Sequence, residues 1–199
     1  MPINDGGMLI VSAFKSGSAE DCRHSNQTII YDYYLSGTLY IDGASAKLVQ
    51  PVVVYFWLIY DSEPRGKDPG LTDVFRTPWR RAPSTWVISR SASHRFVIKR
   101  HWTHTMTSDG LVASSNATST TLHNPVPTNI LDVRKYVSGL NVPTEWMSLG
   151  DGTIGDIKKG ALYIVFAARQ GLSGDGAGVT TNVNFVGQHR VYFRVCCIW

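Results

Sequence analysis

The sequence VVVYFWLIY at residues 52–60 decides the fold class of this chain. Every residue in it is aliphatic or aromatic, and several are β-branched. A short, continuously apolar run of this kind is typical of a β-strand that is covered on both faces. The run stops at DSEPRGKDPG, residues 61–70, which is dense in turn-forming residues. We therefore predict a buried central strand and a following loop in which Thr72 and Asp73 cap one short helical turn.

The rest of the chain repeats strand signals and gives almost no helix signal. Along residues 29–41 the odd positions are mainly apolar and the even positions are mixed, which is the period of a strand with one buried face. Further strands are predicted at residues 85–90, 94–106, 129–137, 143–149, 161–168 and 188–198. We predict a single all-β domain over residues 1–199, with residues 1–14 as an N-terminal lead-in. It is expected to be an eight-stranded jelly-roll sandwich of two antiparallel sheets, with at most a short helical turn in a loop.

The formal net charge of +4 conceals a strongly basic segment. Residues 65–100 contain nine Lys and Arg residues against Asp68 and Asp73, nine minus two, which is a net charge of +7. The remainder of the chain therefore carries −3. Such segregation favours a polyanionic partner such as nucleic acid. A solvated loop and strand face is the alternative explanation.

Residues 94–102, HRFVIKRHW, place part of this charge on a predicted strand. Alternation puts Phe96, Ile98 and Trp102 on one face and Arg95, Lys99 and His101 on the other, with Arg100 near the rim. The basic face would extend about 20 Å, at roughly 3.3 Å per residue. That length suffices to follow several phosphates of one nucleic-acid strand, with affinity supplied by counterion release.

The last predicted strand repeats the pattern. Arg190, Tyr192 and Arg194 alternate with Val191, Phe193 and Val195. An aromatic ring between two cations lets a base stack while phosphates pair, as in single-strand binding. A polar face in water or a contact between subunits is the alternative for both strands. Together the strands predict this nucleic-acid-binding set: Arg90, Arg95, Lys99, Arg100, His101, Arg190, Tyr192 and Arg194.

Catalytic and metal chemistry have no recognisable arrangement in the sequence. His101 and His104 are three residues apart, which puts them on opposite faces of a strand, so we do not expect them to chelate one metal. Cys22, Cys196 and Cys197 form an odd set without Cys-x-x-Cys spacing, which is typical of reduced thiols. We predict no enzyme, catalytic residue, metal or cofactor. We also predict no membrane span, because the longest apolar run is half of what a helical span needs.

Several blocks of the sequence are similar to one known family. They are VYFWLIYD at residues 54–61, WVISR at 86–90 with HRFVIKRHW at 94–102, TEW at 144–146, DGTIGDI at 151–157 and KGALYIV at 159–165. Their order and spacing, over roughly residues 12–195, resemble the coat proteins of geminiviruses, especially the mastrevirus-like branch.

The resemblance implies a coat protein that self-assembles into twinned, incomplete icosahedral particles around circular single-stranded DNA. It also implies a place in the virion and the host cell nucleus, contact with the host nuclear-import machinery, and recognition by an insect-vector receptor. Family members usually carry a basic arm before the β domain. Here the first basic residue is Lys15, so we expect that arm not to be present in this chain.

Two other interpretations stay open. A jelly-roll module outside any shell could bind single-stranded nucleic acid or, like a lectin, sugar, by stacking on Trp79, Trp86 and Trp102. Core packing or subunit contact is the more common use of such residues. An enzyme on a jelly-roll scaffold would need a metal cluster of His and carboxylate side chains, and the sequence shows none.

Overall fold

The predicted central strand is β3 (Val52–Asp61), which lies between β8 (Ala161–Gln170) and β4 (Phe96–Met106) in an antiparallel sheet. β1 (Gly7–Ile10) pairs with the other edge of β8 and completes this four-stranded sheet. Successive side chains of β3 are buried in two different apolar clusters, one on each face of the sheet. The prediction of a strand covered on both faces is confirmed.

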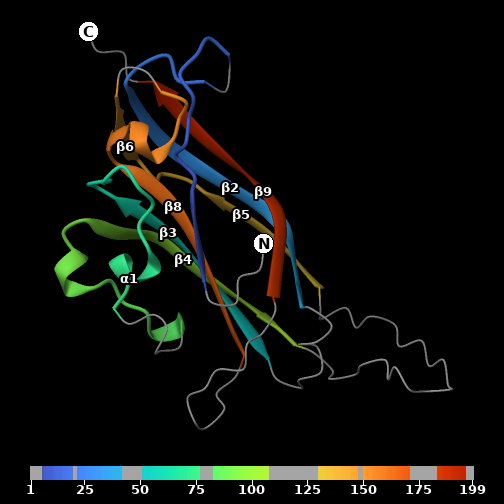
Figure 1. Ribbon diagram of the computed structural model, residues 1–199. Helices are drawn as coiled ribbons and strands as arrows, with labels where there is room; N and C mark the ends of the chain where they lie inside the picture. The colour runs from blue at the N-terminus through green and yellow to red at the C-terminus, as the bar shows by residue number, and fades with distance from the viewer. Residues whose placement is uncertain are drawn as a thin grey trace, which may run out of the picture.

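The computed structural model (Figure 1) describes seven segments of the chain. They are residues 6–19, 22–41, 51–76, 83–107, 130–147, 150–170 and 183–195. Three residues named above, Trp79, Cys196 and Cys197, lie outside these segments, as do Arg80 and Arg81 of the basic segment at residues 65–100.

The second sheet is organised around β2 (Gln27–Ile41), a 15-residue strand. β9 (Val183–Val195) pairs along almost the whole of one edge of β2. β5 (Ile130–Val137) and β6 (Val142–Trp146) share the other edge, and β7 (Ile157–Lys159) pairs with β6. In Figure 1 β2, β5 and β9 lie side by side, and β3, β4 and β8 form the second group.

The two sheets enclose one main core. Tyr33 and Leu39 of β2 and Val54 and Phe56 of β3 all belong to it and are completely buried. Burial of each large apolar side chain contributes roughly 1.5–3 kcal/mol. Alternation along β2 follows the predicted odd positions from Tyr33 onward. It changes phase at a β-bulge between Ile30 and Asp32, so that Ile30 rather than its neighbours is buried.

A smaller apolar cluster covers the outer face of β3. The predicted helical turn is present as α1 (Leu71–Val74), but Gly70 is its N-cap, so Thr72 lies within the turn instead of capping it. Asp73 also lies within the turn, and its carboxylate accepts the backbone N–H of Gly70 at 2.8 Å. Phe75 and Trp86 pack on Trp57, and the two indole rings are stacked with centroids 5.5 Å apart. This cluster closes the face of the β3 sheet that points away from β2.

The prediction of a strand at residues 85–90 is wrong. This region contains the 3₁₀ turns η3 (Pro83–Thr85) and η4 (Arg90–Ala92), with one isolated bridge between Phe75 and Ile88. Its apolar side chains cover the face of β3 instead of extending a sheet. A third 3₁₀ turn, η6 (Ile154–Asp156), precedes β7.

The described residues contain nine strands where eight were predicted. The strand predicted at residues 85–90 is absent, and β1 and β7 were not predicted because they have too few residues to show a period. The class is confirmed: an all-β sandwich of two antiparallel sheets, close to a jelly roll, with one helical turn and short 3₁₀ turns. In the described part of the chain no helix has the length and apolar character that crossing a membrane requires.

Candidate nucleic-acid interface

β9 presents the predicted alternation of cationic and apolar side chains. Val191 and Phe193 pack against the main core, whereas Arg190, Tyr192 and Arg194 are exposed. The antiparallel register fixes this orientation, because residues directly opposite each other on neighbouring strands share a face. The outward side of β9 therefore continues onto the outward side of β2.

The register extends this surface across three strands. Arg190 lies opposite Tyr34 of β2, and Tyr34 lies opposite Tyr136 of β5. Tyr192 contacts the ring of Tyr136 edge-on, with centroids 6.5 Å apart. Arg134 stands on the same face, two residues before Tyr136, and is exposed. Arg194 continues the same outward side of β9 and is also exposed. We call Tyr34, Arg134, Tyr136, Arg190, Tyr192 and Arg194 the tyrosine–arginine face.

The carboxylates on this face already have donors within the protein. Asp32 accepts the hydroxyl of Tyr136 at 2.5 Å and the backbone N–H of Gly139 at 3.3 Å. Asp132 accepts the hydroxyl of Thr38 at 2.8 Å. The hydrogen bond to Asp32 raises the pKa of Tyr136, so the phenol stays neutral at physiological pH. Neither Arg134 nor Arg190 forms an ion pair with a described residue, which leaves both cations available to a phosphate.

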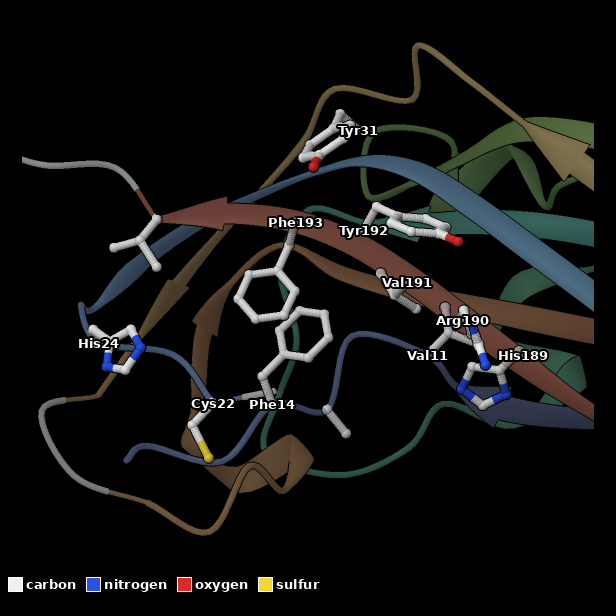
Figure 2. A pocket seen from close by; sticks show the side chains of 12 residues that line it. Val11, Phe14, Cys22, His24, Tyr31, His189, Arg190, Val191, Tyr192 and Phe193 are labelled. Atoms are coloured by element: carbon white, nitrogen blue, oxygen red, sulfur yellow. The ribbon is translucent and has the colours of Figure 1, made fainter. Parts of the chain in front are cut away.

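A hollow of about 930 Å³ lies beside β9. Figure 2 shows Phe14 and Phe193 facing each other within it; their ring centroids are 4.1 Å apart. In the same view Tyr31 and Tyr192 lie on the other side of the β9 ribbon, away from these phenyl rings. Phe14 and Phe193 thus lie on the core side of β9, and Tyr31 and Tyr192 lie on its exposed side.

The predicted basic face of β4 is not formed. Arg100 pairs with Leu58 and Ile98 pairs with Ile59, so Lys99 is the extra residue of a β-bulge. The bulge reverses the phase of the strand. The Lys99 ammonium lies 5.3 Å from the ring centroid of Tyr60, whereas His101 stacks on Trp57 at 5.2 Å, on the opposite face of the sheet. The prediction that Lys99 and His101 share one face is therefore wrong.

Arg95 is not on the exposed surface of the strand, contrary to the prediction. Its Nε and Nη2 atoms donate to the two carboxylate oxygens of Asp61, each at 2.7 Å. The Arg95 side chain is 9% exposed and that of Asp61 is completely buried. The sequence placed these residues 34 positions apart, so the alternation pattern could not reveal that the charge is paired.

The other predicted residues of this region are exposed but scattered. Arg90 lies in η4, and the Arg100 guanidinium donates to the carbonyl oxygens of Lys99 at 2.8 Å and Ser138 at 3.4 Å. Burial lowers the pKa of His101, so its imidazole adds no positive charge at neutral pH. Because Ser138 follows β5, β4 lies at the β5 edge of the sandwich. β9 lies at the opposite edge, so the two basic sets are not one surface.

The histidines and tryptophans have structural surroundings. His101 and His104 stand on opposite faces, as predicted, since His104 meets the ring of Phe56 edge-on. Trp86 is buried and Trp102 is half-buried, stacked on Phe56 with centroids 5.7 Å apart. Among the described residues, no group of three or more His, Cys, Asp or Glu side chains is placed to hold a metal ion.

A two-sheet β sandwich close to a jelly roll is the architecture that viral coat domains share with lectins and cupins. Residues 1–198 match the family described as the Geminivirus coat protein/nuclear export factor BR1 family, and the chain belongs to that family. The known proteins similar to this chain that are described below are named capsid proteins, and a capsid protein has a structural role.

The curated relatives support the mastrevirus-like resemblance. The chain is 35% identical to the capsid protein of Miscanthus streak virus (isolate 91), over 97% of this chain and 75% of that protein. It is 35% identical to the capsid protein of Maize streak virus genotype C (isolate Set), over 96% and 76%. It is 33% identical to the capsid protein of Tobacco yellow dwarf virus (strain Australia), over 95% and 71%.

Proposed function

We propose that this chain is a coat protein that assembles with copies of itself into a closed shell around circular single-stranded DNA, with the tyrosine–arginine face against the DNA. The observation that carries the DNA contact is the cross-strand row of Arg190, Tyr34 and Tyr136, with Tyr192 beside it. Membership of the coat protein family supports the shell.

The geometry suits a flexible single strand better than a duplex. Exposed rings on a sheet offer flat platforms on which successive bases stack, and cations between them meet the phosphates. Stacking does not discriminate strongly between bases, so the contact would tolerate any genome sequence. Of the residues predicted from the sequence, Arg190, Tyr192 and Arg194 keep this proposed role. Arg90, Lys99, Arg100 and His101 stay separate candidates, because they do not share one surface and each would contact DNA singly, outside this face.

The same proposal places the protein in the virion and the host cell nucleus. A host nuclear-import receptor and an insect-vector receptor would be its further partners. The alternative, a monomeric single-strand or sugar-binding module, loses support because Trp86 and Trp102 are packed against other aromatic rings.

Negative-stain electron microscopy of the purified chain with circular single-stranded DNA, at low and physiological salt, tests the shell. Uniform closed particles, single or twinned, are the expected result. Dispersed protein that only coats DNA irregularly would support the binding-module alternative for this chain.

Salt-dependent binding to a short oligothymidylate tests the DNA contact separately. Each lost phosphate contact lowers the slope of log affinity against log salt by about 0.7 for a single strand, so Arg190→Gln with Arg194→Gln should lower it by about 1.4. The matched control removes two exposed charges from β7, as Lys158→Gln with Lys159→Gln, and should leave the slope unchanged. Equal slopes for all three proteins would exclude this face as the DNA contact.

A further inference from the structure

A second, smaller hollow of about 330 Å³ lies on the outer side of the β3 sheet, next to α1 and η4. The tyrosine–arginine face is the outer side of the other sheet, so the two sites are separate. Cationic side chains of Arg65, Lys67 and Arg95 line the hollow, and His94 adds an imidazole. Hydroxyl groups of Thr72, Ser89 and Ser91 complete the polar wall.

Arg95 gives this hollow a fixed donor. A guanidinium has five N–H groups, and Asp61 takes one from Nε and one from Nη2. Among the described residues no acceptor binds Nη1. The side chain is more than nine-tenths buried and held by two hydrogen bonds. Binding a ligand through its remaining N–H groups therefore costs little conformational entropy.

The charges in and behind the hollow leave a positive excess. Asp61 balances Arg95 from the buried side, and Asp73, which also lines the hollow, accepts the backbone N–H of Gly70 at 2.8 Å. Arg65 and Lys67 then outnumber Asp73 by one. Cations, hydroxyls and one rigid guanidinium are the donor set that recognises tetrahedral oxyanions, since charge-assisted hydrogen bonds to phosphate are strong and directional.

We propose that this hollow is a phosphate-binding site, in which Arg95, Arg65 and Lys67 hold the oxygens of one phosphate group. The phosphate comes either from a nucleic-acid backbone or from a free ion or nucleotide. The proposal is independent of the tyrosine–arginine face, and it gives Arg95 a role in binding that does not require an exposed strand position.

Calorimetric titration of the full chain with inorganic phosphate at constant ionic strength tests the site. Wild type should bind, and Arg65→Gln with Lys67→Gln should weaken the affinity at least about tenfold, because two charge-assisted contacts are lost. The control is Lys15→Gln with Arg76→Gln, which removes two exposed charges outside the hollow and should bind phosphate as wild type does. Thermal unfolding verifies that all three proteins are folded.

Competition with oligothymidylate distinguishes the two sources of phosphate. If the oligonucleotide displaces inorganic phosphate, and more weakly in the Arg65→Gln, Lys67→Gln variant, the site holds a backbone phosphate. If phosphate stays bound in the presence of the oligonucleotide, the site holds a free phosphate or nucleotide. Absence of phosphate binding by wild type, or equal affinity for the hollow and control variants, would overturn the proposal.

Discussion

Replacing Arg95 by Met tests whether this basic side chain belongs to the folded framework. Arg95 is joined to Asp61 by two 2.7 Å hydrogen bonds, and the Asp61 carboxylate is completely buried. In Arg95→Met that carboxylate keeps the backbone N–H of Glu63, at 3.0 Å, but loses its counter-charge. Removing one partner of a buried ion pair costs roughly 3–5 kcal/mol. We expect a loss of that size, against a total stability of about 5–15 kcal/mol for a typical domain.

Urea denaturation followed by tryptophan fluorescence measures this loss, because Trp57 and Trp86 lie in the neighbouring cluster. Arg90→Met, at an exposed position, is the control and should change the free energy of unfolding by no more than about 0.5 kcal/mol. Asp61→Asn combined with Arg95→Met should recover part of the loss, since it removes the uncompensated buried charge. A loss below about 1 kcal/mol for Arg95→Met alone would refute the framework role.

Tyr136→Ala should weaken oligothymidylate binding by about 1–3 kcal/mol through lost stacking, and Tyr136→Phe should retain it; equal losses in filter binding would contradict stacking. Gly160→Ala should lower the thermal unfolding midpoint, because φ is +73° and a Cβ would collide with the carbonyl oxygen of Pro143; an unchanged midpoint would contradict this. Burial lowers the pKa of His101 and His104, so the unfolded chain binds more protons below about pH 6.5. The free energy of unfolding in urea should be fully present above that pH and should decline on acidification. His104→Gln should make this decline smaller, and a free energy that does not change with pH in wild type would refute the prediction.

Local sequence was enough to predict a strand that is buried whichever strands pair with it. Residues 52–60 are apolar throughout, so they form a central strand whichever neighbours pair with them. Alternation along β2 predicted the buried positions from Tyr33 onward for the same reason. The bulges near Tyr31 and at Lys99 could not be predicted, because a bulge is a property of two paired strands. One inserted residue at Lys99 was sufficient to separate His101 from Lys99, with which it had been grouped.

In the candidate site too, features within one strand could be predicted, and features that depend on strand pairing could not. Arg190 and Tyr192 were found because they are two residues apart on one strand. Tyr34 and Tyr136 were missed because their position beside these residues depends on the register between β2, β5 and β9, which joins residues about 100 or more positions apart. A signal was present in the sequence, since polar and aromatic residues occupy the even positions from residue 32 to residue 40 of the predicted strand at residues 29–41. Without the pairing, that face could not be connected to the arginines of β9.

The count of charges along the chain could not separate cations that bind a partner from cations that stabilise the fold. Arg95 contributes to the +7 segment as fully as Arg65 does, yet its charge is matched by Asp61 just outside that segment. The pair fixes the start of β4 to the end of β3, where the loop that carries Arg65 and Lys67 begins. The basic segment therefore combines a framework cation with surface cations in one hollow. The phosphate site that we propose therefore depends on the geometry that this buried pair maintains as well as on net charge.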